Sequence, residues 1–265
     1  MEAQQLNLSS ALLTLSVLAD SGLEHYRGSF QNRAMYTPIA VSALTLIASV
    51  MGTMDRRPQR HAARDAIYGL AAATGLAGLL FHAYNVTKRP GGLSWLNLFY
   101  AAPIGAPGAL VLAGLLGKGA ERARRPAASR QEFGRALAAV TAAGLAGTAL
   151  ETALLHFRGA YHNPAMVLPV SVPPVAATLL GAAAITPGRR VGRLARWWLK
   201  LTALLGFAGV GFHAYGVSRN MGGWRNWSQN VLNGPPLPAP PSYTGLALAG
   251  LAALGLIDRR KSIDG

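Results

Sequence analysis

The chain has 265 residues and a net charge of +15, yet only 13% of its residues are charged and 51% are hydrophobic. A soluble domain carries about 25% charged residues, so the composition favours a membrane protein. Because the basic residues fall between long apolar segments rather than on one face, we expect no nucleic-acid partner. The sequence has no cysteine, which excludes disulfides, iron–sulfur clusters and thiolate metal sites.

Eight apolar segments are long enough to span a bilayer, which takes about 20 mostly apolar residues. In chain order they are 6–25, 36–54, 66–87, 98–116, 137–156, 164–185, 197–217 and 243–257. Pro38 and Pro169 fall in the first turns of the second and sixth segments, where proline is tolerated. We therefore predict an all-α integral membrane protein with about eight transmembrane helices.

Two blocks of sequence recur at one offset of 131 residues. Residues 25–38 match 156–169 at seven of fourteen positions, and 81–92 match 212–223 at seven of twelve. The shared offset predicts an internal repeat of two tandem four-helix units.

The repeat divides the chain into a first half, 1–117, and a second half, 136–265, joined by a basic linker at 118–135. An extended outer loop at 219–242 precedes the last helix. Matching residues 109–117 to that helix needs an insertion of about six residues.

The basic residues predict the orientation of the chain. Eighteen of the 25 Lys and Arg residues fall on the side that holds both ends of the chain, and seven fall on the other side. By the positive-inside rule, both termini are expected in the cytoplasm, and we expect a multi-pass protein of the bacterial inner (plasma) membrane. Because each unit has an even number of helices, the two units are expected to be parallel, related by an axis along the membrane normal.

Four of the six histidines recur at matched positions near the outer ends of helices. His25 and His82 of the first half match His156 and His213 of the second. Around them lie further matched polar pairs: Asp20 with Glu151, Arg27 with Arg158, and Tyr84 with Tyr215. An ionisable group within a membrane is costly, so this constellation is a candidate functional site.

The leading interpretation is a b-type haem held between helices. Such a haem takes one imidazole from each of two helices at the same depth, and Arg or Tyr for its propionates. His25 with His82, and His156 with His213, supply two such pairs side by side. This arrangement suits lateral electron transfer between an outer partner and the quinone pool.

We therefore expect an electron-transfer subunit, not a complete enzyme alone, that anchors a periplasmic-side respiratory oxidoreductase. Its partners would be the lipid bilayer and other subunits of a membrane complex on the periplasmic side. No residue is assigned a catalytic role.

Three alternatives stay open. The matched histidine, carboxylate and tyrosine could bind a quinone headgroup and exchange its protons. Alternatively, the chain could bind or transport copper or iron, for which Asp20, Glu24, His25, His82 and Met35 offer mixed oxygen, nitrogen and sulfur ligands, with His156 and His213 in the second half. Finally, the polar residues could tie helix ends to the outer loops of a non-catalytic anchor or scaffold. A transporter would place its repeated polar residues near the midplane, which this pattern does not.

Overall fold

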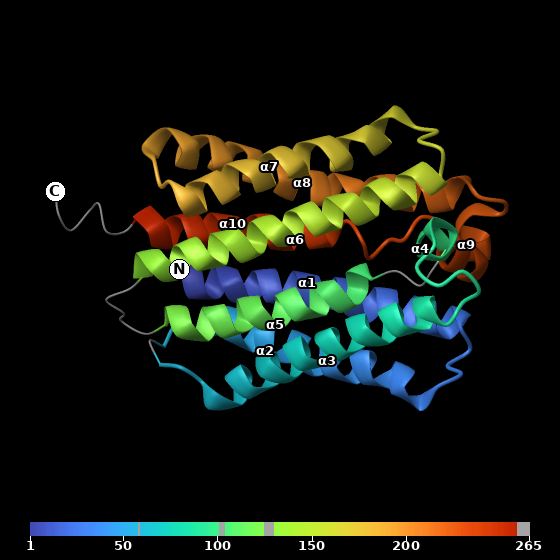
Figure 1. Cartoon of the computed structure of the whole chain (residues 1–265), viewed down its shortest axis with the longest axis horizontal. Helices are drawn as coiled ribbons and strands as arrows, with labels where there is room; N and C mark the ends of the chain where they lie inside the picture. Colours follow the sequence, from blue (N-terminus) through green and yellow to red (C-terminus); the bar gives the residue numbers. More distant parts are fainter. Residues whose placement is uncertain (58, 101–103, 125–129, 259–265) are drawn as a thin grey trace.

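The computed structural model describes the chain except for residues 58, 101–103, 125–129 and 259–265, and the described part is all-helical with no strand (Figure 1). Its elements are α1 (Glu2–Arg27), η1 (Arg33–Tyr36), α2 (Thr37–Met54), α3 (Ala62–Thr87), α4 (Trp95–Tyr100), α5 (Gly105–Ala123), α6 (Arg130–Arg158), η2 (Pro164–Val167), α7 (Leu168–Ile185), α8 (Arg189–Arg219), η3 (Gly223–Asn226), α9 (Trp227–Asn233) and α10 (Pro241–Asp258). The long helices run back and forth along one bundle, with the short helices α4 and α9 at the same end.

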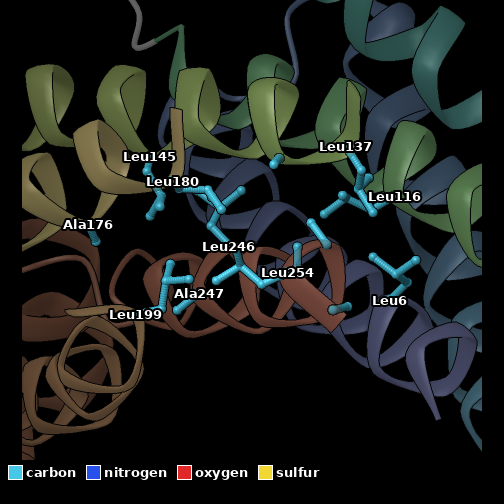
Figure 2. Close-up of a cluster of buried hydrophobic side chains, with 14 of the residues drawn as sticks. Leu6, Leu116, Leu137, Leu145, Ala176, Leu180, Leu199, Leu246, Ala247 and Leu254 are labelled. Carbon is cyan, nitrogen blue, oxygen red and sulfur yellow. The ribbon is translucent and has the colours of Figure 1, made fainter. Parts of the chain in front are cut away.

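The halves of the chain meet along the middle of this bundle. In the first half α1 packs on α2 and α5, and α3 packs on α5; in the second, α10 packs on α6 and α8, and α7 packs on α6 and α8. Contacts of α1 with α10 and of α5 with α6 join the halves. The buried leucines of this region come from six helices, α1, α5, α6, α7, α8 and α10 (Figure 2).

The outer helices present large apolar side chains to the surroundings. Ile47 on α2 is 59% exposed, Leu80 on α3 65%, and Leu204 and Phe207 on α8 65% and 66%. A soluble protein rarely leaves so much contiguous apolar surface in water. Seven of the described helices are also long and apolar enough to cross a membrane. The chain is a multi-pass membrane protein whose outer helices contact the lipid bilayer.

The fourth predicted segment, 98–116, has different bounds in the structure. The helix α4 ends at Tyr100, and α5 begins at Gly105. Pro107 lacks an N–H and is best tolerated in a first helical turn, where this start of α5 places it. The helix then continues to Ala123, and three charged residues in its last turns, Lys118, Glu121 and Arg122, leave it outside the seven apolar spans. With α6 starting at Arg130, helix extends into the predicted linker 118–135 from both sides.

Close helix contacts in the two halves match at a new offset. A Cβ on Gly75 of α3 would lie 2.6 Å from the Pro107 carbonyl oxygen of α5. A Cβ on Gly206 of α8 would lie 2.9 Å from the Pro240 carbonyl oxygen, at the start of α10. The two glycines are 131 residues apart in the sequence, whereas the two prolines are 133 apart. The last helices therefore align with two inserted residues, not with the six that sequence matching suggests.

The outer loop 219–242 is built like its counterpart in the first half. Asn230 of α9 donates a hydrogen bond from Nδ2 to the Gly223 carbonyl at 2.8 Å, and Asn97 of α4 does the same to the Gly92 carbonyl at 2.8 Å. The inserted residues thus lie between these glycines and asparagines.

Candidate functional site at the histidine end

We call the end of the bundle that carries α4 and α9 the histidine end, and the opposite end the basic end. His25 lies in the last turns of α1, and His156 in the last turns of α6. In the turn after each helix, two consecutive non-glycine residues adopt the left-handed conformation. They are Ser29, Phe30, Ala160 and Tyr161, with φ of 56°, 46°, 55° and 46°. Such residues are strained, and strain of this kind gathers at functional sites.

The strained turn brings its second residue against the histidine. The backbone N–H of Phe30 donates to the His25 carbonyl at 3.0 Å, and that of Tyr161 donates to the His156 carbonyl at 3.1 Å. Their rings stand edge-on to the imidazoles, with centroids 6.3 and 6.0 Å apart. The turn thereby limits the rotation of each imidazole.

A hydrogen bond fixes the tautomer of both rings. Nδ1 of His25 lies 2.7 Å from the Met35 carbonyl oxygen, and Nδ1 of His156 lies 2.8 Å from the Met166 carbonyl oxygen. A carbonyl oxygen can only accept, so Nδ1 carries the proton and donates it. In the neutral ring Nε2 is then left with a free lone pair. Metal-ligating histidines have this arrangement, with the other ring nitrogen bound to a carbonyl or carboxylate.

His213 on α8 has the same kind of tether. Its Nδ1 lies 2.7 Å from the Pro236 carbonyl oxygen, in the loop before α10, and the ring is within electrostatic range of His156. His82 occupies the matched position on α3. The residue that matches Pro236 is Pro103, which lies outside the described residues. Three of the four predicted ligands thus present a free Nε2, and in the second half the two histidines are within electrostatic range of each other.

The predicted acids come together from both halves. Asp20 on α1 is within electrostatic range of Glu24 and of Glu151 on α6. Oε1 of Glu151 accepts a hydrogen bond from the backbone N–H of Gly105, the first residue of α5, at 2.8 Å. A carboxylate there satisfies a free N–H and lies at the positive end of the helix dipole. Glu151 therefore joins α6 to α5 through this hydrogen bond.

The predicted arginines have partners away from the histidine rings. Nη1 of Arg27 binds Oε1 of Glu24 at 2.7 Å on the surface. The guanidinium of Arg158 lies over the rings of Phe99 and Tyr100 on α4, 5.6 Å from each centroid. Arg158 thus holds α4 against the end of α6.

The predicted tyrosines are exposed and also have local partners. The Tyr84 ring is covered by Lys88, whose Nζ is 4.3 Å from the centroid. The hydroxyl of Tyr215 accepts a hydrogen bond from Nη1 of Arg219 at 3.2 Å. Both side chains are more than half exposed, which suits the membrane interface.

Protein ligands alone do not form a metal centre in the described part of the chain. No group of three or more His, Asp or Glu side chains is arranged there to hold a metal ion. A haem iron, in contrast, needs only two imidazoles from the protein, because the macrocycle supplies four nitrogens. His156 and His213, each tethered at Nδ1, carry donor atoms of the kind a haem iron would take.

A buried charge cluster at the basic end was not expected from the sequence. Arg64 on α3 donates from Nε to Oε1 of Glu121 on α5 at 2.8 Å, and from Nη2 to Oδ2 of Asp55 at 2.9 Å. Arg124 donates from Nη2 to the Gly52 carbonyl at 2.7 Å. The four charged side chains are at most 9% exposed. We call Asp55, Arg64, Glu121 and Arg124 the buried charge cluster.

The charges of this cluster stabilise one another. The backbone N–H of Arg57, followed by the guanidinium groups of Arg64 and Arg57, holds the pKa of the Asp55 carboxyl well below its usual range. Asp55 is therefore ionised at neutral pH.

Further into the bundle, the Tyr68 hydroxyl donates to Oδ1 of Asn7 at 2.6 Å.

The second half has apolar residues where the first half has Arg64, Glu121 and Arg124, whereas the match of Asp55 is the polar Thr186. At the offset of 131, Arg64 matches Ala195, Asn7 matches Ala138 and Tyr68 matches Leu199. At the offset of 133 that the helix contacts give for α5 and α10, Glu121 matches Leu254 and Arg124 matches Ile257. All five apolar residues are buried. The fold thus forms without these charges.

The chain matches no known family model, no curated protein and no solved structure. What it can do must therefore be argued from its own residues.

Proposed function

We propose that the chain is an electron-transfer membrane subunit whose matched histidines hold haem b at the histidine end. One observation carries the proposal: Nδ1 of His25, His156 and His213 is bound to a backbone carbonyl, which leaves Nε2 as a ligand atom. The carbonyl bond also makes the imidazole a stronger ligand and fixes its orientation. A haem bound there would supply one-electron transfer.

The pairs that would hold the haem are His156 with His213, and His25 with His82. Each pair comes from two helices of one half, so a rigid spacing of those helices would set the ligand geometry. That spacing is set through a third helix: Gly75 locks α3 against α5, which also packs on α1, and Gly206 locks α8 against the start of α10, which also packs on α6. The strained turns restrict the rings of His25 and His156.

We further propose that the protein arose as two parallel four-helix units, with α5 as an eighth membrane-spanning helix. Matched turns, matched tethers and matched glycine contacts support it. By the positive-inside rule, the basic end then lies in the cytoplasm of a bacterial inner membrane. The histidine end would face an oxidoreductase subunit on the periplasmic side.

Haem content tests the proposal. The full chain, expressed with excess haem and purified in detergent, is expected to carry haem b in a stoichiometric ratio. His213→Ala and His156→Ala should lose one haem each, since one imidazole alone holds iron weakly. His162→Ala is the matched control, because His162 is exposed at the same end and its match is Gln31. A folded wild-type protein without haem absorbance would contradict the proposal.

A quinol site is the second candidate, and the grouped acids favour it. A free Nε2 can accept a hydrogen bond from a quinol hydroxyl. Asp20 is within electrostatic range of Glu24 and Glu151, and these carboxylates could take up the protons of the quinol. This reading predicts that a ubiquinol analogue raises the melting temperature of the haem-free protein, and that His25→Ala abolishes the shift. If the chain is only a scaffold, neither effect is expected. The complex that contains it should then keep its activity when it carries His82→Ala or His213→Ala.

A further inference from the structure

At the basic end, one side of α8 carries a hollow of about 320 Å³. Its lining is strongly basic and includes one aromatic ring: Arg189, Arg193, Arg196, Trp197, Lys200 and Asp258. Arg189, Arg193, Arg196 and Lys200 follow one another by four, three and four positions, and Trp197 follows Arg193 by four, so the five residues share one face of the helix. Four cations thus converge on a single concave surface beside the membrane-spanning part of α8.

Most of this positive charge is not neutralised by the described part of the chain. Nη2 of Arg196 binds Oδ2 of Asp258 at 2.8 Å. Nζ of Lys200 lies 5.4 Å from the Trp197 ring centroid, which leaves its charge available. Among the described residues, Arg189 and Arg193 have no acidic partner, and both are exposed. The hollow is therefore an anion site by its electrostatics.

The matched helix of the first half has no such face. Arg193, Trp197 and Lys200 correspond at the offset of 131 to Ala62, Ala66 and Gly69. The helix α3 forms and packs without these residues, so folding does not require them. General attraction of basic residues to one side of the membrane does not explain why one helix gathers them around a hollow.

The same face of α8 continues as apolar surface. Leu204 and Phe207, four and seven positions after Lys200, are 65% and 66% exposed. Trp197, 62% exposed, lies one turn before Lys200 and two turns before Leu204, near the start of this apolar strip, and tryptophan is common at membrane interfaces. We propose that this face binds one anionic phospholipid, with its phosphate in the hollow and its acyl chains along Leu204 and Phe207. A free phosphate would use the hollow but not the strip.

Native mass spectrometry of the full chain, released from phosphatidylcholine nanodiscs with added phosphatidylglycerol, tests this site. Wild type is expected to retain one phosphatidylglycerol in preference to phosphatidylcholine. The triple variant Arg189→Gln, Arg193→Gln, Lys200→Gln should bind phosphatidylglycerol at least about tenfold more weakly than wild type. The matched control Arg56→Gln, Arg122→Gln, Arg190→Gln removes three charges at the same end and should bind like wild type.

Two results would overturn the proposal. The first is equal retention of phosphatidylglycerol by wild type and the Arg189, Arg193 and Lys200 variant, with both eluting as folded monodisperse protein. The second is displacement of the lipid by millimolar inorganic phosphate, which would assign the hollow to a soluble anion. If the triple variant loses the lipid but also melts earlier, a second variant separates binding from folding. Leu204→Ser with Phe207→Ser should weaken lipid binding while all four cations remain.

Discussion

At the residue scale, the imidazole of His156 is held by the Met166 carbonyl and by a turn that contains two left-handed residues. The turn is strained at Ala160, where φ is 55°. We predict that Ala160→Gly raises the free energy of unfolding by about 0.5–1 kcal/mol, because glycine adopts this conformation freely. Ala160→Val should lower it by about 1–2 kcal/mol. Denaturation in detergent measures both, and equal effects of the two substitutions would contradict the strained turn.

Also at the residue scale, Asp55 predicts a pH dependence. Its folded-state pKa lies below the ordinary value, so its ionised form stabilises the fold. That stabilisation is fully present above the unfolded pKa of about 4, and it is lost as the pH falls through the folded pKa. The melting temperature of Asp55→Asn should therefore lie below that of wild type at neutral pH, and the gap should shrink only below about pH 4. A gap that closes between pH 8 and 6 would point to another group.

At the scale of elements, glycine contacts set the distance between α3 and α5. A Cβ on Gly75 would lie 2.6 Å from the Val111 backbone nitrogen as well as from the Pro107 carbonyl. Gly75→Ala is expected to lower the free energy of unfolding by about 1–3 kcal/mol, since helix backbone must move. Gly211→Ala on α8, whose Cβ would meet nothing within 4 Å, is the control and should be neutral or stabilising. Similar melting curves for both variants would refute the close approach.

The buried charge cluster gives a second prediction at this scale. Glu121→Leu leaves Arg64 and Arg124 buried without their carboxylate, so the free energy of unfolding should fall by about 3–5 kcal/mol. The combined variant Arg64→Ala, Glu121→Leu, Arg124→Ile installs the residues of the second half. It should recover most of the loss, because apolar residues replace these three buried charges while Asp55 keeps its hydrogen bonds to Arg57. A triple variant less stable than Glu121→Leu alone would show that the cluster is required for folding.

At the scale of the whole molecule, the number of crossings depends on α5. The chain has no cysteine, so single thiols can be placed at exposed residues of the basic end. Arg56→Cys and Arg190→Cys flank α3, α5, α6 and α7. If α5 crosses the membrane, an impermeant thiol reagent labels both from the same side, and labels Arg33→Cys from the other. Labelling of Arg56→Cys and Arg190→Cys from opposite sides would mean that α5 does not cross.

Apolar length and the offset of 131 were enough to predict an all-helical membrane protein and to single out the four histidines. Sequence could not place the start of α5, because the break depends on Pro107 fitting a first turn. The buried charge cluster could not be predicted because Arg64 and Glu121 are 57 residues apart in the sequence and meet only where α3 packs on α5. The tethers of His25 and His213 depend on loop carbonyls that only a folded chain brings near.

The central claim is that Nε2 of the paired histidines ligates a haem iron. Electron paramagnetic resonance of the oxidised, purified full chain tests it most directly. Two imidazole ligands would give a low-spin ferric signal, which is expected for wild type and for His162→Ala. The signal should be weaker in His213→Ala, where one histidine pair is broken. A wild-type protein that is folded, expressed with excess haem, and yet shows no low-spin ferric signal would contradict the claim.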